Sequence, residues 1–214
     1  MKSFAQKDSS ILLFPIKAEA IVFDREIRSM LQYNKVQPDS AKKFILNLME
    51  DNLKNNFPNF KVQNFDEFKQ TSFNKDSLQY SDQMTSTVQK RIEKSKGYGK
   101  MILMNDSRRT LKYYGCIVDS LDSIQLKQMT GKYNFNYVLF LNKLEMVPGT
   151  RLDNNTRLIL NFDIYNQDLS KINGDKCFAD MDVSIDMYFN VFQYFLPKAI
   201  NELLIQFRKT EPMK

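Results

Sequence analysis

A basic segment between Val88 and Tyr114 holds the side chains with the clearest chemical potential in this chain. It contains eight basic and two acidic residues, a balance of +6 that equals the net charge of all 214 residues. The basic residues are Lys90, Arg91, Lys94, Lys96, Lys100, Arg108, Arg109 and Lys112. Because three tyrosines are interleaved with them, the segment can hold a nucleic-acid backbone, an anionic lipid surface or an acidic glycan. No helix-turn-helix or RNP-type motif accompanies it, which favours a solvated helix-and-loop surface.

Carboxylates at strand spacing form a second constellation. Asp180, Asp182 and Asp186 are spaced to project from one face of a strand, and Asp163 can face them from the neighbouring strand. Such a set could bind a hard cation such as calcium. A solvated strand face that discourages edge pairing explains the same residues, and the absence of a metal-loop spacing favours it. The sequence therefore predicts no metal site.

Catalytic and cofactor motifs are sparse. The chain has no histidine, the commonest general base and metal ligand. The run from Gly97 to Lys100 lacks the GxxxxGK[ST] frame of a phosphate loop, so it indicates a flexible turn. Pairs of carboxylates among 25 acidic residues arise by chance, which leaves a carboxylate-dependent enzyme as an unsupported alternative. We predict no catalytic residue and no cofactor.

The two cysteines favour a structural role. Cys116 falls in a predicted helix and Cys177 on the apolar side of a predicted strand, where small buried thiols are common. A disulfide between them is the alternative. A catalytic thiol is disfavoured because no histidine is present to act as its base.

Composition favours one folded domain spanning residues 1–214, with 1–8 and 209–214 flexible. The apolar content of 43% can build a core, and with 6 Gly and 6 Pro the chain lacks low-complexity linkers. No apolar run approaches the roughly 20 residues of a membrane span. The amino terminus lacks the apolar core of a secretory signal, so the protein is cytoplasmic or its signal has been removed.

Hydrophobic periodicity predicts an α+β fold. Ile11–Phe14 forms a buried strand ended by Pro15, which 20–23 can continue, and a helix capped by Asp39 runs to Phe57. The next predicted elements are a short strand within 59–76, a helix over 78–92, a strand over 101–104 and a helix from Asp106 or Ser107 to Leu121.

The carboxy-terminal pattern is more regular. A buried strand over 135–144 and a turn at Pro148-Gly149 precede alternation over 158–165. A turn at Asn173-Gly174 and alternation over 177–187 complete a hairpin with one apolar and one wet face. A closing amphipathic helix over 192–208 covers it, and Pro197 kinks this helix or marks its start. We expect a mixed sheet of four or five strands, mostly antiparallel towards the carboxyl end, with helices packed on one face.

This order of elements resembles the domain shared by the TolB amino-terminal region, the CsgG secretion lipoprotein and the LpoB-type activators of penicillin-binding proteins. The first strand ends in Phe14-Pro15, and Asn134 to Leu139 is similar to the later "aDYvl"-like strand of such domains. The small residue and glycine that usually flank that strand are missing, as is a lipidation cysteine near the start.

The resemblance implies a non-enzymatic, lipoprotein-like binding or assembly module in the periplasm or on the outer membrane, with another envelope protein as its partner. It would reach the membrane only through a lipid anchor absent from this chain. The alternatives are a cytoplasmic protein that binds nucleic acid or an acidic ligand through the basic segment, and a carboxylate-dependent enzyme.

Overall fold

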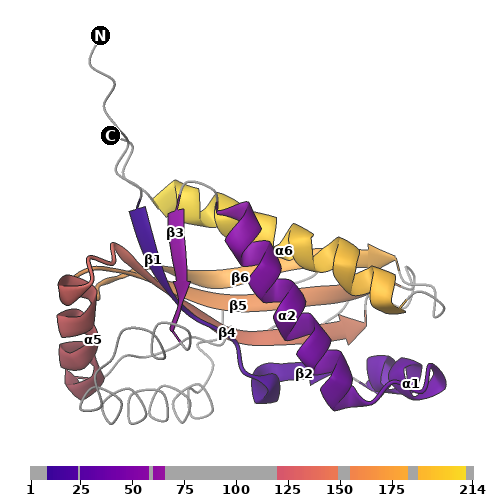
Figure 1. The fold of residues 1–214 in the computed structure, drawn as a ribbon. Coiled ribbons are helices and arrows are strands. Elements are labelled where there is room, and N and C mark those ends of the chain that lie inside the picture. The colour runs from indigo at the N-terminus through magenta and orange to yellow at the C-terminus, as the bar shows by residue number, and fades with distance from the viewer. Residues whose placement is uncertain are drawn as a thin grey trace.

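The structure, a computed structural model, describes residues 9–23, 25–57, 60–65, 120–148, 155–182 and 188–210. These residues form an α+β domain around one mixed sheet (Figure 1). The strands are β1 (Ser9–Phe14), β2 (Ile21–Phe23), β3 (Phe60–Asn64), β4 (Tyr137–Pro148), β5 (Asn155–Asn166) and β6 (Lys171–Asp182). The helices are the short 3-10 helix η1 (Ala18–Ala20), α1 (Arg25–Tyr33), α2 (Pro38–Asn56), α5 (Ser120–Lys132) and α6 (Tyr188–Thr210).

The sheet combines a parallel half with an antiparallel half. Its order is β3-β1-β4-β5-β6, with β2 also paired to β4. β1 pairs in parallel with both β3 and β4, whereas β4, β5 and β6 are antiparallel neighbours. β1 and β2 pair with successive parts of β4, so the segment after Pro15 does continue the first strand, after an interruption by η1.

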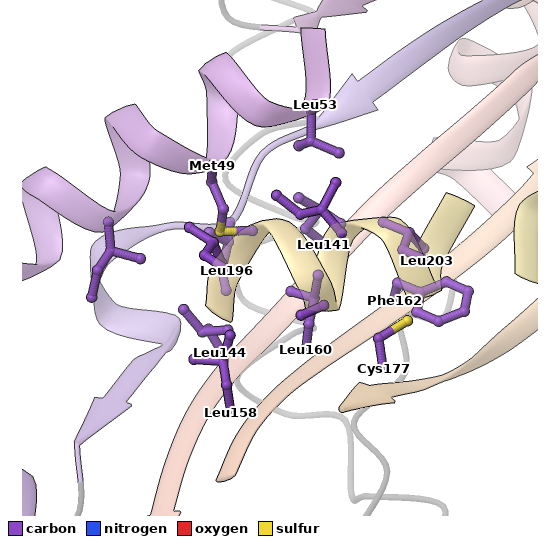
Figure 2. Packing of buried hydrophobic residues seen from close by; sticks show 14 of the residues in the cluster. Met49, Leu53, Leu141, Leu144, Leu158, Leu160, Phe162, Cys177, Leu196 and Leu203 are labelled. Carbon is purple, nitrogen blue, oxygen red and sulfur yellow. The ribbon is translucent and has the colours of Figure 1, made fainter. Parts of the chain in front are cut away.

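Alternating side chains divide the sheet into two faces. The α6 face carries the larger core, which includes Leu13, Leu141, Leu160 and Cys177 and is covered by α2 and α6. Figure 1 shows these two helices crossing the same side of the sheet, and Figure 2 shows their apolar side chains pointing at the strands. The opposite α5 face carries a smaller core that α5 covers. Its members are Leu12, Phe14, Phe65, Leu126, Met129, Phe135, Val138, Phe140 and Tyr165.

β4 contains a bulge that changes which residues face the core. The pairing of β4 with β5 shifts by one residue between Leu141 and Lys143. Before the shift Leu141 lies in the core of the α6 face, and after it Leu144 does. Asn142 is therefore the extra residue, and its side chain turns to the α5 face. Bulges of this kind bend a strand and redirect side chains.

The sequence predicted most of these elements. The α+β class, the hairpin and the closing helix are confirmed, and the sheet has six strands rather than four or five. Helices cover both faces rather than one, because α5 packs on the face opposite α2 and α6. β1, α2 and the short strand within 59–76, now β3, are confirmed as well. Helix α1 was not predicted. The predicted helix from Asp106 or Ser107 to Leu121 reaches into α5 at residues 120 and 121, and its earlier residues lie outside the described residues. The predicted elements over 78–92 and 101–104 lie outside the described residues.

Predictions about one helix cap and one turn were wrong. Asp39 is not the N-cap of α2, because the helix begins at Pro38 and Gln37 precedes it. Proline is favoured at the first helical position, where its missing N–H is not needed. The hairpin turn is not at Asn173-Gly174, which lies within β6. The chain turns between Asn166 and Lys171, where Leu169 N–H donates to the Asn166 carbonyl at 2.9 Å.

Pro197 lies inside α6, nine residues after its first residue, so it does not mark the start of the helix. Lys209 and Thr210, which the sequence placed in a flexible tail, belong to α6. Residues 1–8 and 211–214 lie outside the described residues.

Candidate functional site

The sequence-predicted basic surface cannot be placed in the fold. All eight of its basic residues, from Lys90 to Lys112, lie outside the described residues, as do Cys116 and the glycine turn at 97–100. The search for a site therefore concerns the polar groups of the sheet and the exposed helix surfaces that the structure does describe.

The alternation of the hairpin predicted that Asp163 lies on a solvated strand face, and the structure contradicts this. Its side chain is fully buried on the α5 face of β5. The Asp163 carboxylate accepts a hydrogen bond from Asn142 Nδ2 at 2.8 Å and forms an ion pair with Lys171 Nζ at 2.5 Å. A buried carboxylate persists when it is paired and hydrogen-bonded, and Asp163 has both kinds of partner.

Two irregularities of the sheet create this arrangement. The bulge in β4 supplies Asn142, and a second shift in pairing, between Ile164 and Tyr165 of β5, accompanies the start of β6 at Lys171. Gly174 lies directly opposite Asp163 and has no side chain to compete for the space. The network therefore fixes the register of three strands.

Of the four carboxylates considered from the sequence, Asp163, Asp180, Asp182 and Asp186, the three that the structure describes are not assembled into one cluster. In the strand register Asp163 lies opposite Gly174, whereas Asp180 lies opposite Arg157, six residues farther along β5. That separation is about 20 Å at 3.3 Å per residue. Asp186 lies outside the described residues. Within the described ranges, no group of three or more His, Cys, Asp or Glu side chains is placed to hold a metal ion.

Cys177 is a buried, unbridged thiol on the α6 face, as the sequence predicted. Burial raises the pKa of the Cys177 thiol far above its ordinary value of 9.0, and the carboxylates of Glu202 and Asp175 raise it further. Because the thiolate is the reactive form, Cys177 is chemically inert in the folded protein.

The outward side of α6 presents the clearest candidate binding surface. Its buried side packs on the sheet, but Tyr194 is 71% exposed and Ile205 is 44% exposed. These two residues are eleven positions apart, which places them within about 20° on a helix and about 16 Å along its axis. We call the exposed residues that lie on this line along the helix, three or four positions apart, the α6 stripe. They are Tyr194, Lys198, Asn201, Ile205 and Arg208.

The charge of the α6 stripe is basic. Lys198 and Arg208 belong to it and Lys209 adjoins its end, while Glu202 is the nearby acidic residue. The Lys198 ammonium lies 4.8 Å from the centre of the Phe195 ring, a cation–π distance that holds it beside the helix. Apolar anchors flanked by cations are suited to a protein surface of opposite charge.

Sequence reasoning identified the buried stripe of α6 but missed Tyr194 and Ile205. The available signal was their position: both interrupt the polar side of an otherwise amphipathic helix at a spacing of eleven residues. None of the described helices combines the length and the apolar character needed to cross a membrane.

No protein-family model and no curated protein matches the chain. Solved structures with similar shape include the hypothetical protein CT253 from Chlamydia trachomatis, at 7% identity and a TM-score of 0.41, covering 95% of this chain and 93% of that one. The lipoprotein GNA1162 from Neisseria meningitidis is 9% identical with a TM-score of 0.31, covering 94% and 99%. The PelC dodecamer from Paraburkholderia phytofirmans is 9% identical with a TM-score of 0.30, covering 94% and 91%. At these identities and TM-scores, the similarities define neither a family nor a function.

Proposed function

We propose that this chain is a non-enzymatic binding or assembly module of the cell envelope that contacts another protein through the α6 stripe. The proposal rests on two exposed apolar residues, Tyr194 and Ile205. They are aligned on one side of a helix whose opposite side is buried in the core. Large apolar side chains held rigidly on a helix are typical anchors of protein interfaces.

The chemistry of the stripe specifies the partner. The basic residues Lys198 and Arg208 flank the exposed Ile205, so the partner presents an apolar groove or helix bordered by carboxylates. A spacing of alternating three and four residues along the stripe matches the packing of one helix against another. Truncating Tyr194 to alanine should cost about 2 kcal/mol of binding, which weakens the complex about thirtyfold.

The location in the envelope is supported by the order of elements. The strand that ends in Phe14-Pro15, the later strand that begins at Tyr137, the hairpin and the closing helix follow one another as in the envelope domains that the sequence resembles. We infer that a lipid anchor on a longer precursor would tether the module to the membrane.

Site-specific photo-crosslinking in the native cell tests the contact. A photoreactive phenylalanine analogue at position 194 should give one defined adduct, and the adduct should weaken when Lys198 or Arg208 is changed to glutamate. Gln128, exposed on α5 at the opposite face of the sheet, is the matched control position. Equal adducts from positions 194 and 128, or an adduct that ignores charge reversal, would reject the stripe as the interface.

Location is tested separately by the mass and start site of the native protein after fractionation. A lipid-modified cysteine on a longer precursor in the envelope fraction supports the envelope module. An unmodified cytoplasmic chain starting at Met1 refutes it, and binding of nucleic acid by the basic segment then becomes the next hypothesis. Such binding should weaken steeply with salt and be lost when Arg108, Arg109 and Lys112 are neutralised.

A further inference from the structure

The parallel half of the sheet brings the carboxyl ends of two neighbouring strands to the same edge. β1 and β3 are adjacent and parallel, so Leu13 near the end of β1 and Asn64 at the end of β3 lie side by side in the register. Helix α2 covers the α6 face of the sheet here. Pockets for small ligands are concave, mostly apolar and bordered by a few polar groups.

A half-open pocket of about 180 Å³ lies at this point. Its walls are apolar and come from three elements, with Leu13 at the end of β1, Leu141 on β4 and Met49 on α2. All three side chains are buried. Two polar residues also line the pocket. The Glu50 side chain of α2 is 36% exposed and forms the polar rim, whereas Asn64, the last residue of β3, is buried.

The volume limits what the pocket can hold. An apolar cavity of about 150 Å³ in a protein core admits benzene. The pocket therefore accepts one six-membered ring or a branched chain of similar size, and its open side leaves room for one substituent to reach the rim.

The rim selects the charge of that substituent. The Glu50 carboxylate already attracts one cation, since its Oε1 lies 2.9 Å from Lys54 Nζ in an exposed ion pair. Exposed pairs of this kind are weak, so a second ammonium can share or replace the lysine at little cost.

We propose that this pocket is a binding site for a small molecule that combines one ring or branched chain with a cationic amino group. The site is independent of the α6 stripe, because no residue of the stripe lines it. Either can exist without the other.

Methyl NMR of the full chain tests the site with three probes of equal ring size: benzylamine, toluene and benzoate. Benzylamine should shift the methyl signals of Leu13, Met49 and Leu141, toluene should do so more weakly, and benzoate least. Changing Glu50 to glutamine should weaken benzylamine up to about fivefold and leave toluene unchanged. Because Glu50 is exposed to solvent at the rim, this variant should keep the wild-type fold.

A filled pocket provides the second arm. Leu46→Phe adds a ring to the lining of the pocket, and Leu48→Phe adds the same ring to the same helix outside the lining. The shifts should disappear in the first variant and persist in the second. Shifts that survive Leu46→Phe, equal affinity for benzoate and benzylamine, or no shift with any probe would each overturn the proposal.

Discussion

The buried ion pair between Asp163 and Lys171 should be strongly coupled. Asp163 is fully buried, whereas the Lys171 side chain is 39% exposed and can turn into solvent when its partner is removed. Breaking a fully buried pair costs about 3–5 kcal/mol, because one charge is left without compensation. Solvent near Lys171 screens part of that cost, so Lys171→Gln should lower the free energy of unfolding by about 2 kcal/mol.

Asp163→Asn should lower the free energy of unfolding by a similar amount. The asparagine keeps an acceptor for Asn142 but offers no negative charge to Lys171, and weakening a buried hydrogen bond of this kind costs about 1–3 kcal/mol. The double variant contains neither charge. It should lose about 2 kcal/mol rather than about 4, which gives a coupling energy near 2 kcal/mol.

Urea unfolding at pH 7 measures the cycle. Far-UV circular dichroism is the suitable signal, because the chain contains no tryptophan. The exposed pair of Lys127 and Asp168, at 3.7 Å, is the control, and Lys127→Gln should change stability by less than about 0.5 kcal/mol. If the two effects at Asp163 and Lys171 add within about 0.5 kcal/mol, the reasoning fails, because additivity would mean that the two groups do not sense each other.

Three further outcomes follow from single residues. The raised pKa of Cys177 means that its stabilising contribution is complete below pH 9 and is lost as pH rises above 9. In a Cys116→Ser background, the free energy of unfolding of the protein with Cys177 should therefore fall relative to that of Cys177→Ala by up to about 1.4 kcal/mol per pH unit above pH 9. Lys35 is exposed at φ 55°, after the end of α1, so Lys35→Gly should raise stability in urea by about 0.5–1 kcal/mol, whereas Lys43→Gly inside α2 should lower it by about 1 kcal/mol. Phe207 packs edge-on against three other rings, and Phe207→Ala should lose about 3–5 kcal/mol; a loss below about 1 kcal/mol would contradict this packing.

Patterns that repeat within one element were readable from the sequence. The alternation of Leu158, Leu160 and Phe162 assigned these residues to one face of a strand, and the structure places all three in the core. The broad apolar stripe of α6 was predicted for the same reason, since burial on one side imposes the period of the helix on the sequence.

Features that depend on distant partners were not readable. Asn173-Gly174 has the composition of a hairpin turn, but Gly174 is placed in a strand opposite Asp163 and the turn forms earlier. Asp163 looked solvated because its partners Asn142 and Lys171 are 21 and 8 residues away in sequence. The sequence pattern alone does not predict the bulge in β4 that brings Asn142 to Asp163.

Helix α6 has two roles in this fold. One of its side chains binds the backbone at the open edge of β6, and its outward side carries the α6 stripe. Gln206 of α6 donates a hydrogen bond to the Lys176 carbonyl of β6 at 3.5 Å, and Gly174 N–H donates to the Asn173 side chain at 2.8 Å. Gly174 and Lys176 are alternate residues, which direct their backbone groups to the same edge of the strand. A strand added at this edge would have to displace both bonds. The outward side of α6 has no such obstacle, because Tyr194 and Ile205 are already exposed, and a partner can bind there without disturbing the sheet.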